Sequence, residues 1–579
     1  MKAITKLLHY MKPYKVFAIL GPLFMCMEVV MDLFQPTIMQ KMIDTGIAQQ
    51  DNDYVLKMGL LMLVCAVLGL IGGAGSSVYA AKAAVPFAAD IRRDIFQKIM
   101  QFSNRNSDTV GTGKCITIVT SDIETIKQAV IMTLRVFVRG PLLFIGSVVI
   151  VWLSARELFP ILLVSIPILM ILITFFSVKS GKLFLHVQKA MDGVNTKLQE
   201  MLAGIRVIKA FERQDYEKGQ FRTVNEVLMQ RNMTAEQLVL TLMPMMMFIV
   251  NLGIIAGLWL GVIKVNEGTL QVGVILAFIN YLNIMMNGLM SSSQVLMQIA
   301  RSFSSAGRIV QVIETEVDIV EHNASKPYQS VRGEVEFRHV NFSYSKNGES
   351  VLTDISFTVK AGQTIGIIGS TGSGKSTLVK LIPRLYDPDC GEIFIGGQNI
   401  KQIPLEKLRS MIGFVPQKAE LFSGTIAANL RYGDEAATDA DLEWAAKSAA
   451  AAEFIERFAN KYEHQLMQSA TNLSGGQKQR LSMARAFIRK PKILIFDDST
   501  SAIDALSESK VQQTLKSANG KQTIFIISAK ISSIITANQI LVMEDGRMVA
   551  RGTHQELLAT SKVYHDIYAS QTGREVQVG

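Results

Sequence analysis

The chain has 579 residues and a formal net charge of +10; 49% of its residues are hydrophobic and 19% are charged. This length is enough for about three or four ordinary domains. Most of the basic excess lies beside long apolar segments, where Lys and Arg mark the cytoplasmic side of a membrane, so it does not indicate a nucleic-acid partner. The four cysteines are Cys26, Cys65, Cys115 and Cys390. They are scattered and form no C-x-x-C pair, which argues against a metal site or a disulfide framework.

Apolar segments dominate the first 300 residues. Residues 1–13 mix lysines with leucines and a tyrosine, which predicts a short amphipathic helix on the inner membrane face. No small-residue cleavage site follows the first apolar run, so we expect no cleavable signal peptide. Six later segments are long enough to cross about 30 Å of hydrocarbon as helices. They lie near 15–39, 56–81, 129–154, 158–178, 238–263 and 270–299.

The connections between these segments differ in length. Three are short, at 40–55, 155–157 and 264–269. Two are long, helical in pattern and rich in Lys and Arg, at 82–128 and 179–237. The basic excess predicts that the long connections and both termini are cytoplasmic. We expect the long ones to form helical hairpins that project from the membrane, with turns at 111–113 and within 202–211; ordinary solvated loops are the alternative.

Few ionisable residues lie inside the predicted spans. Glu28 and Asp32 are four residues apart, so they share one face of the first helix. Arg135 and Arg139 are spaced in the same way in the third. A charge at the bilayer centre costs about 3 kcal/mol even on insertion scales, so these side chains should face a wet cavity or one another. Two interpretations remain open: a polar wall of a translocation path, or a structural carboxylate–guanidinium pair.

Methionines are frequent in the fifth and sixth spans. Flexible, polarizable side chains suit a surface that accepts varied apolar ligands, although methionines also serve as ordinary lipid-facing or core residues. They favour a hydrophobic ligand without requiring one. The residues are Met243, Met245, Met246, Met247, Met285, Met286, Met290 and Met297.

The second half of the chain contains a contiguous glycine-rich motif. Its residues are Gly369, Ser370, Thr371, Gly372, Ser373, Gly374, Lys375, Ser376 and Thr377, which match G-x-x-x-x-G-K-[ST] in every fixed position. A buried strand is predicted before the motif, at 364–368, and a helix after it, which is the context that a phosphate-binding loop needs. The glycines let backbone N–H groups face a phosphate, while Lys375 would reach the β- and γ-phosphates and Ser376 would bind Mg²⁺. The motif therefore predicts nucleotide binding.

Shorter motifs surround this loop. Residues 335–337 and 340–344 are predicted strands, and the second ends in Tyr344. Gln417 ends a Phe-Val-Pro-Gln segment, and 473–477 reads Leu-Ser-Gly-Gly-Gln. An apolar run at 493–497 ends in Asp497, and Ser-Ala-Ile-Asp follows at 501–504. In this order, and preceded by six apolar segments, the whole chain resembles an ATP-binding cassette (ABC) exporter half-transporter.

The resemblance implies a role for each matching position. Tyr344 would stack on adenine, Gln417 would touch Mg²⁺ and face the membrane domain, and Asp497 would hold Mg²⁺ directly or through water. The residues Ser474, Gly475, Gly476 and Gln477 form the family's signature motif. Their N–H groups at a helix start make an anion site, which in the family closes on ATP held by a second subunit. Two chains would then sandwich two ATP molecules.

Two catalytic positions depart from the family pattern. Asp498 stands where the family has a glutamate that positions or deprotonates the attacking water, and Ala529 stands where it has a histidine that senses the γ-phosphate. An aspartate carboxylate is withdrawn by about 1 Å, and a misplacement of that size can cost about a hundredfold in rate. An alanine side chain can neither donate nor accept a hydrogen bond. Residues 466–470 also lack the family's Gly-Glu-Arg-Gly.

These departures predict a chain that binds ATP, hydrolyses it slowly, and completes an active site on a non-identical partner. A homodimer in which Asp498 still serves is the alternative. We expect an exporter of hydrophobic or amphipathic substrates, of multidrug type. A gated channel or regulatory subunit is a second class, although no regulatory insertion separates the motifs. The length of the apolar runs excludes a soluble ATPase with a buried helical core.

The predicted fold class is an all-α transmembrane domain of six helices followed by an α/β P-loop ATPase domain. The expected boundaries are 1–316 for the membrane domain, 317–332 for a linker and 333–579 for the nucleotide-binding domain. We expect the protein in a bacterial plasma membrane, in contact with lipid, a second half-transporter and a hydrophobic small molecule.

Overall fold

The computed structural model describes residues 2–319, 333–345, 348–517 and 522–572. The chain divides into two compact units, of which one contains residues 1–99 and 113–314 and the other contains 100–112 and 315–579. Residues 100–112, which lie between two long helices in the sequence, therefore pack with the second unit. The predicted linker at 317–332 falls outside the described residues except for 317–319.

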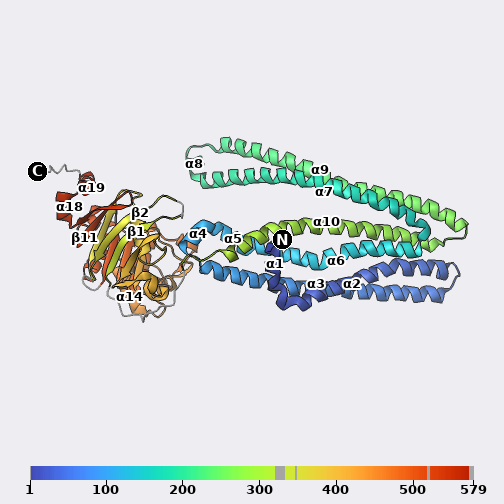
Figure 1. The fold of residues 1–579 in the computed structure, drawn as a ribbon, viewed down its shortest axis with the longest axis horizontal. Coiled ribbons are helices and arrows are strands. Elements are labelled where there is room, and N and C mark those ends of the chain that lie inside the picture. The colour runs from blue at the N-terminus through green and yellow to red at the C-terminus, as the bar shows by residue number, and fades with distance from the viewer. Residues whose placement is uncertain (1, 320–332, 346–347, 518–521, 573–579) are drawn as a thin grey trace. The chain divides into compact units, whose positions relative to one another are not determined.

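Six long helices dominate the first unit (Figure 1). They are α2 (Lys15–Lys41), α3 (Asn52–Met100), α6 (Ile123–Ser154), α7 (Phe159–Ala203), α9 (Gln214–Asn266) and α10 (Val272–Glu314). Within the described residues, six helices are long and apolar enough to cross a membrane, as the sequence predicts. Leu70, Ile171 and Trp259 are among the large apolar side chains exposed on these helices, which is the surface that lipid tails would cover.

The long helices continue beyond their apolar parts, so the helical pattern predicted for the two long connections is confirmed. In the first connection the chain breaks into α4 (Asn104–Val110) and α5 (Thr112–Thr117), followed by a π-turn at Ile118–Asp122. Gly111, with φ 81°, ends α4 in a conformation that favours glycine. In the second connection, α8 (Ile205–Ala210) joins α7 to α9, and these two helices lie side by side (Figure 1).

Short elements complete the first unit. The N-terminal segment forms α1 (Lys2–Leu8) and a 3₁₀ turn, η1 (His9–Tyr14), as the amphipathic pattern predicts. A π-turn at Met42–Ile47 and a 3₁₀ turn at Arg156–Leu158 lie in two of the short connections. The backbones of α6 and α10 approach closely, because a Cβ placed on Gly140 would lie 2.7 Å from the Gly288 carbonyl oxygen. Small residues permit such close contact between membrane helices.

The methionines of the fifth and sixth spans do not form a single surface. Met246, Met285 and Met286 are buried in the core of the helical unit, whereas Met243, Met245 and Met247 are exposed. Met290 is partly buried, and the Met297 side chain lies outside the described residues. Packing between helices therefore accounts for three of the eight positions singled out in the sequence.

In its described residues, the second unit contains three sheets. A six-stranded sheet has the order β12-β11-β3-β10-β9-β6, a four-stranded sheet has the order β2-β1-β4-β5, and β7 pairs with β8. The strands are β1 (Val335–Phe342), β2 (Leu352–Val359), β3 (Thr364–Gly369), β4 (Cys390–Ile395), β5 (Gln398–Asn399), β6 (Ile412–Val415), β7 (Gly424–Thr425), β8 (Gln465–Leu466), β9 (Ile493–Asp497), β10 (Thr523–Ile527), β11 (Gln539–Glu544) and β12 (Arg547–Gly552).

Nine α-helices and four 3₁₀ turns connect these strands within the described part of the second unit. The helices are α11 (Lys375–Leu381), α12 (Leu405–Ser410), α13 (Ile426–Arg431), α14 (Asp439–Ser448), α15 (Ala452–Ile455), α16 (Gly475–Ile488), α17 (Ala505–Ser517), α18 (His554–Thr560) and α19 (Lys562–Thr572). The 3₁₀ turns are Ile400–Gln402, Lys461–Glu463, Gln468–Ala470 and Ile531–Ser533.

The six-stranded sheet brings the motif-bearing loops to one edge. Strands β3, β6, β9 and β10 are mutually parallel, and Ile527 at the end of β10 is opposite both Ile367 and Asp497. The strands are almost wholly buried, which explains their continuous apolar sequence. Because parallel strands end at the same edge, the residues that follow them gather there, as in other nucleotide-binding α/β sheets.

One strand prediction needs correction. The segments 335–337 and 340–344 form a single strand, β1, with bulges between Phe337 and Phe342. The strand ends at Phe342, so Tyr344 lies in the loop that follows it rather than in the sheet. His339, with φ 47°, marks the irregularity, since a left-handed residue interrupts the alternation of a regular strand.

Candidate nucleotide-binding site

Backbone conformation shapes the loop between β3 and α11. A Cβ on Gly369 would lie 2.0 Å from the carbonyl oxygen of Met543, so no side chain fits at this strand end. Gly374, with φ 90°, starts α11 in the left-handed region. A Cβ on Gly372 would meet nothing within 4 Å, so that side of the loop faces open space. Ser373 closes the loop by donating its hydroxyl to the Ser370 carbonyl at 2.8 Å.

The Lys375 ammonium lies inside this loop. Its Nζ donates to the carbonyl oxygens of Gly369 and Ser370 at 2.9 and 2.6 Å, and lies 3.3 Å from the Ser373 hydroxyl. Burial lowers the pKa of Lys375, while the charges of Asp498 and Asp497 act in the opposite direction. A half-buried cation at a helix start, in a loop with one open side, fits a bound phosphate.

Ser376 and Asp497 are brought together, as the predicted metal site requires. The Ser376 hydroxyl donates to Asp497 Oδ1 at 2.5 Å. Asp497 ends β9 and is only 3% exposed, and burial raises the pKa of its carboxyl, partly offset by the Ser376 hydrogen bond. A hydroxyl oxygen next to a carboxylate is the kind of hard oxygen pair that Mg²⁺ prefers. These two residues therefore fit Mg²⁺.

Asp498 and Gln417 meet beside this pair. Gln417 Nε2 lies 3.4 Å from Asp498 Oδ2, so the third predicted metal residue contacts the neighbouring carboxylate rather than Asp497. Asp498 has φ 46°, a conformation that Asp adopts more readily than most residues. Its Oδ1 is buried and has no hydrogen-bond partner among the described residues. Buried polar atoms are nearly always paired, so this oxygen fits contact with a ligand or a water.

Ala529 occupies the loop after β10. Its side chain is a methyl group, and its carbonyl accepts a hydrogen bond from Gln571 Nε2 at 2.7 Å. The preceding Ser528 is buried, and its hydroxyl accepts from the Lys530 N–H at 3.0 Å. At position 529 the chain thus presents no side-chain donor or acceptor to the edge of the sheet.

Tyr344 forms a hydrogen bond with α11, the helix that follows the glycine-rich loop. Its hydroxyl lies 2.9 Å from the Thr377 hydroxyl in the first turn of α11. Its ring packs edge-on against Phe342 and Tyr386, with centroid separations of 5.1 and 5.3 Å. These contacts fix an exposed aromatic ring in the neighbourhood of the loop, where the resemblance expects an adenine-stacking residue.

The signature residues cap a different helix. Ser474 is the N-cap of α16, where its hydroxyl accepts from the Gln477 N–H at 3.3 Å and the Gln477 side chain accepts from the Ser474 N–H at 2.8 Å. This capping box leaves Gly475 and Gly476 in the first turn, where backbone N–H groups are free for an anion. No described hydrogen bond or ion pair joins 474–477 to the loop at 369–377.

The structure adds a contact that no motif indicates. Helix α4 forms hydrogen bonds with residues of the second unit. The Tyr386 hydroxyl donates to Asp108 at 2.8 Å. Arg105 donates to the carbonyl of Ser343, which precedes Tyr344, at 2.7 Å, and to Asp389 at 3.2 Å. Burial, followed by the hydrogen bond to Asp108, raises the pKa of Tyr386. Arg105 is visible in the sequence only as one of many basic residues in a long connection.

The four ionisable residues of the spans lie together in the helical unit. Arg139 of α6 bridges the two carboxylates of α2, at 3.3 Å from Glu28 and 3.1 Å from Asp32. Arg135 instead lines a cavity of about 450 Å³ with Glu28, Asp32 and the glycine-rich face of α3. It has no described ion pair, and its Nε is buried without a partner. The structure therefore supports the pair interpretation for Arg139 and leaves Arg135 facing a polar cavity.

Comparison with known proteins gives matches along the chain. Residues 18–289 match the family "ABC transporter transmembrane region" and residues 352–501 match the family "ABC transporter". An uncharacterized ABC transporter ATP-binding protein of Bacillus subtilis is 41% identical over 99% of both chains. An ATP-dependent lipid A-core flippase of Methylococcus capsulatus is 31% identical over 98% of this chain and 94% of its own.

A solved structure has the same fold. The structure of a bacterial Atm1-family ABC exporter with ATP bound superposes with a TM-score of 0.79, covering 98% of this chain and 99% of the other. Its sequence identity is 24%, so this likeness concerns the fold.

Proposed function

Since this chain belongs to the ABC transporter family, as an exporter half-transporter with an ATP-binding transport ATPase domain, we propose that it forms one subunit of a pump that moves hydrophobic or amphipathic substrates out of the cytoplasm. The observation that carries the proposal is the presence, in one chain, of six spanning helices, a phosphate loop with its Ser376–Asp497 pair, and a capped signature helix.

ABC exporters work as dimers, and we propose that the partner here is a non-identical chain. Asp498 and Ala529 weaken the catalytic side of this chain's own site, whereas the Ser474 cap is intact. Such a chain can complete a partner's site better than it can use its own. The homodimeric alternative requires Asp498 to serve as catalytic carboxylate on both sides.

Each residue then has a defined task. Lys375 and the loop N–H groups bind the phosphates of ATP, and Tyr344 packs against the adenine. Ser376 and Asp497 would hold Mg²⁺, with Gln417 beside them; when bound, the ion would supply positive charge next to the phosphates of ATP. Asp498 accepts a hydrogen bond from the attacking water, but from a withdrawn position. No imidazole at 529 assists it.

The residue assignments imply a division of the chain. We assign 1–316 to the membrane domain, 317–332 to the linker and 333–579 to the nucleotide-binding domain, with both termini in the cytoplasm of a bacterial cell. Helix α4 transmits movement, because its hydrogen bonds reach Tyr386 and Ser343, the neighbours of Tyr344 in space and in sequence. A change at the adenine site therefore has a direct route to the connection between α3 and α6.

The substrate class is inferred from the helical unit. The cavity beside Arg135 combines charged groups with the small residues of α3, including Gly69, Gly73 and Ala74. An amphipathic molecule with an anionic group would pair with the Arg135 guanidinium, which forms no ion pair among the described residues and whose Nε is buried without a partner. The relative from Methylococcus capsulatus is named as an ATP-dependent lipid A-core flippase, and this name supports an amphipathic substrate for the present chain.

Transport by the co-expressed pair tests the function. Inside-out vesicles should accumulate an amphipathic dye against its gradient when ATP is supplied, and Lys375→Ala in this chain should reduce the uptake. A gated channel can only equilibrate the dye, so ATP-dependent flux that stops at equal concentrations would contradict the pump. Brisk ATPase activity of the purified chain without any partner would contradict the heterodimer alone.

A further inference from the structure

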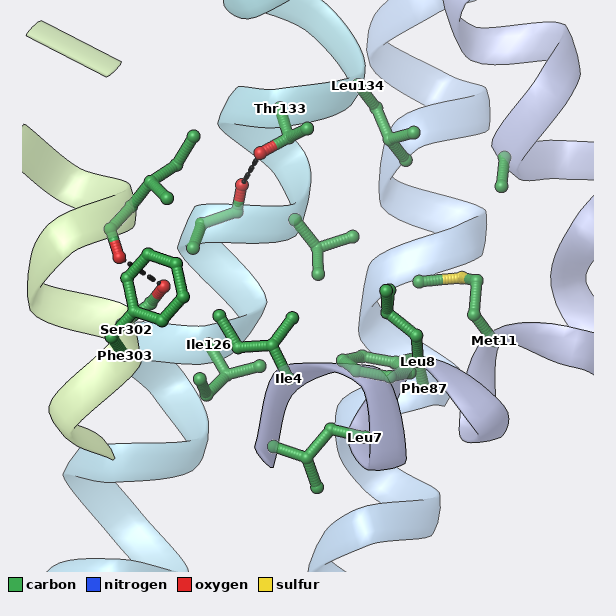
Figure 2. Close-up of a pocket in the computed structure, with 14 residues that line it drawn as sticks. Ile4, Leu7, Leu8, Met11, Phe87, Ile126, Thr133, Leu134, Ser302 and Phe303 are labelled. Carbon is green, nitrogen blue, oxygen red and sulfur yellow. Dashed lines mark hydrogen bonds between the residues drawn. The ribbon is translucent and has the colours of Figure 1, made fainter. Parts of the chain in front are cut away.

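We propose that an apolar pocket under the N-terminal segment holds an acyl chain of an anionic membrane phospholipid. The pocket has a volume of about 320 Å³ and lies between α1 and η1 on one side and α2, α3, α6 and α10 on the other (Figure 2). Known ligand pockets span about 300–1,000 Å³, so there is room for part of a single chain. Leu7 of α1, and Phe87 and Ile126 on the opposite side, are buried residues that line it.

The chemistry of the walls selects hydrocarbon. Two lining side chains carry hydroxyl groups, Thr133 and Ser302, and both donate within their own helices (Figure 2): to the Ala129 carbonyl at 2.7 Å and the Ile299 carbonyl at 2.6 Å. No lining residue has a buried polar atom that lacks a partner. A polar ligand would lose its hydrogen bonds to water here without replacement, whereas an alkyl chain loses nothing.

The segment that covers the pocket carries positive charge. Met11 and Ala18 line the pocket, and between them Lys12 and Lys15 are exposed, with no ion pair among the described residues. Clustered lysines at a membrane surface attract anionic lipid headgroups. With the chain inserted below and the phosphate above, one phospholipid satisfies both the apolar walls and the lysines. The charges of Lys12 and Lys15 complement the headgroup of an anionic membrane lipid, and the competition arm of the experiment below separates this lipid from the transported substrate.

Two contacts hold the N-terminal segment against the long helices that line the pocket. The Tyr14 hydroxyl donates to Asp90 of α3 at 2.7 Å, and Lys6 pairs with Glu314 at the end of α10. The N-terminal segment is thus fastened on both sides of the cavity. Leu8 and Phe303 are 50% and 43% exposed at positions that line it, so apolar side chains continue from the pocket to the surface. An alkyl chain could enter there from the bilayer.

Photolabelling of the full-length protein, assembled with its partner in vesicles, tests the site. The probe is phosphatidylglycerol with a diazirine near the end of one acyl chain, and we expect label on peptides that contain residues 4–11 and 126–134. Val130→Phe should fill the pocket and lower this labelling about tenfold, because excluding two methylene groups costs about that factor. The matched control is Val149→Phe on the same helix, where the side chain is exposed and lines no described pocket.

Further arms separate lipid from substrate. Lys12→Gln and Lys15→Gln should each weaken phosphatidylglycerol labelling by about fivefold and leave a phosphatidylcholine probe unaffected. Ile4→Phe fills the pocket from α1 and provides the test if Val130→Phe fails to assemble. Equal labelling of Val130→Phe and Val149→Phe, or displacement of the probe by the transported dye, would overturn the proposal. Dye transport itself is measured in the same vesicles, so failure of the lipid site is distinguishable from failure of the pump.

Discussion

Position 498 combines a left-handed backbone with a short carboxylate, and we expect the short carboxylate to slow hydrolysis at this chain's own site. Asp498 has φ 46°, in the left-handed region that Asp tolerates; its Oδ2 lies 3.4 Å from Gln417 Nε2, and its Oδ1 is buried without a hydrogen-bond partner among the described residues. A longer side chain would move the carboxylate outward by about 1 Å, toward the position of the family glutamate.

We therefore expect Asp498→Glu, combined with Ala529→His, to raise the turnover of ATP at this chain's own site in the assembled pair by about tenfold to a hundredfold. A phosphate-release assay at saturating ATP measures it. Asp545→Glu is the matched control, since Asp545 is an exposed aspartate with φ 44° and carries the same backbone cost. An unchanged rate in the double variant would mean that neither the short carboxylate nor the missing imidazole limits hydrolysis.

The two nucleotide-binding motifs of the chain should make unequal contributions in the assembled pair. Ser474→Ala should lower the ATPase rate of the complex by about tenfold or more, because it removes the helix cap and the proposed contact to the partner's ATP. Lys375→Ala should lower the rate less, because we propose that this chain's own site contributes little turnover. Steady-state ATPase assays of the two complexes compare them.

The control for Ser474→Ala is Thr553→Ala. Thr553 is the N-cap of α18 and forms the same kind of capping box, with Glu556, away from the site. Both variants should lose about 1 kcal/mol of stability, but only Ser474→Ala should lose ATPase activity. Equal effects of Lys375→Ala and Ser474→Ala would indicate two equivalent sites, as in a homodimer.

At the scale of elements, α4 is the part whose role depends most on the three-dimensional structure. We expect Tyr386→Phe to reduce transport several-fold while leaving ATPase activity near its normal value. Losing a hydrogen bond to the Asp108 carboxylate weakens the contact by about 1.5–3 kcal/mol. Dye uptake and phosphate release from the same vesicles measure the ratio of transport to hydrolysis.

Tyr564→Phe is the control for this contact. Tyr564 is also buried in the second unit, and its hydroxyl lies 2.7 Å from His554 Nδ1, so its loss removes one hydrogen bond far from α4 in the sequence. If transport and ATP hydrolysis fell by the same factor in Tyr386→Phe, and also in Tyr564→Phe, the contact of α4 would have a purely structural role.

Arg135 and Arg139 of α6 should have different roles, because Arg139 forms ion pairs with α2 and Arg135 forms none among the described residues. Arg139→Gln leaves Glu28 and Asp32 without their shared partner. Because these side chains are partly exposed, the cost should be about 1–3 kcal/mol, below the 3–5 kcal/mol of a fully buried pair. We expect poor assembly, measured as yield of the monodisperse complex. Arg135→Gln should assemble normally and lose transport of anionic amphipathic dyes; the reverse pattern would contradict both assignments.

Elements defined by local sequence were predictable, and contacts between distant ones were not. The six spans, the β3–loop–α11 unit and the buried β9 follow from apolar length and a contiguous motif. The predicted end of the first strand, at Tyr344, was wrong by two residues. The bulges in β1 interrupt the alternation of buried and exposed side chains from which a strand end is predicted. The hydrogen bond between Arg105 of α4 and the Ser343 carbonyl joins residues 238 positions apart in the sequence. The pairing of Arg139, rather than Arg135, with Asp32 depends on how α6 is rotated about its axis. Neither contact leaves a pattern in the local sequence.

For the whole molecule, the arrangement across the membrane is the property that most needs a direct test. We expect Thr269→Cys, in the turn between α9 and α10, to react with an impermeant maleimide in intact cells. Glu212→Cys, beside α8, should react only in permeabilised cells, because basic connections stay inside. Both are made after replacing the four native cysteines with serine. Labelling in the opposite order would invert the predicted topology.

The nucleotide-binding site could be predicted only in part, because some of its contacts depend on the fold of the whole molecule. The P-loop and Asp497 could be assigned because the sequence alone fixes their strand–loop–helix context. The placement of Gln417 against Asp498, rather than against Ser376, arises from the order β9-β6 in the sheet, which no local pattern contains. A contact between Ser474 and a second chain belongs to an assembly, and no local sequence pattern encodes an assembly.

The glycine contact between α6 and α10 has a mechanical consequence. At Gly140 and Gly288 a Cβ on either residue would lie 2.7 Å from the carbonyl oxygen of the other, so the two backbones pack directly against each other. The Ser292 side chain fills the remaining space beside Gly140. A bulky residue at either glycine would force α6 and α10 apart along a contact that both helices share over much of their length.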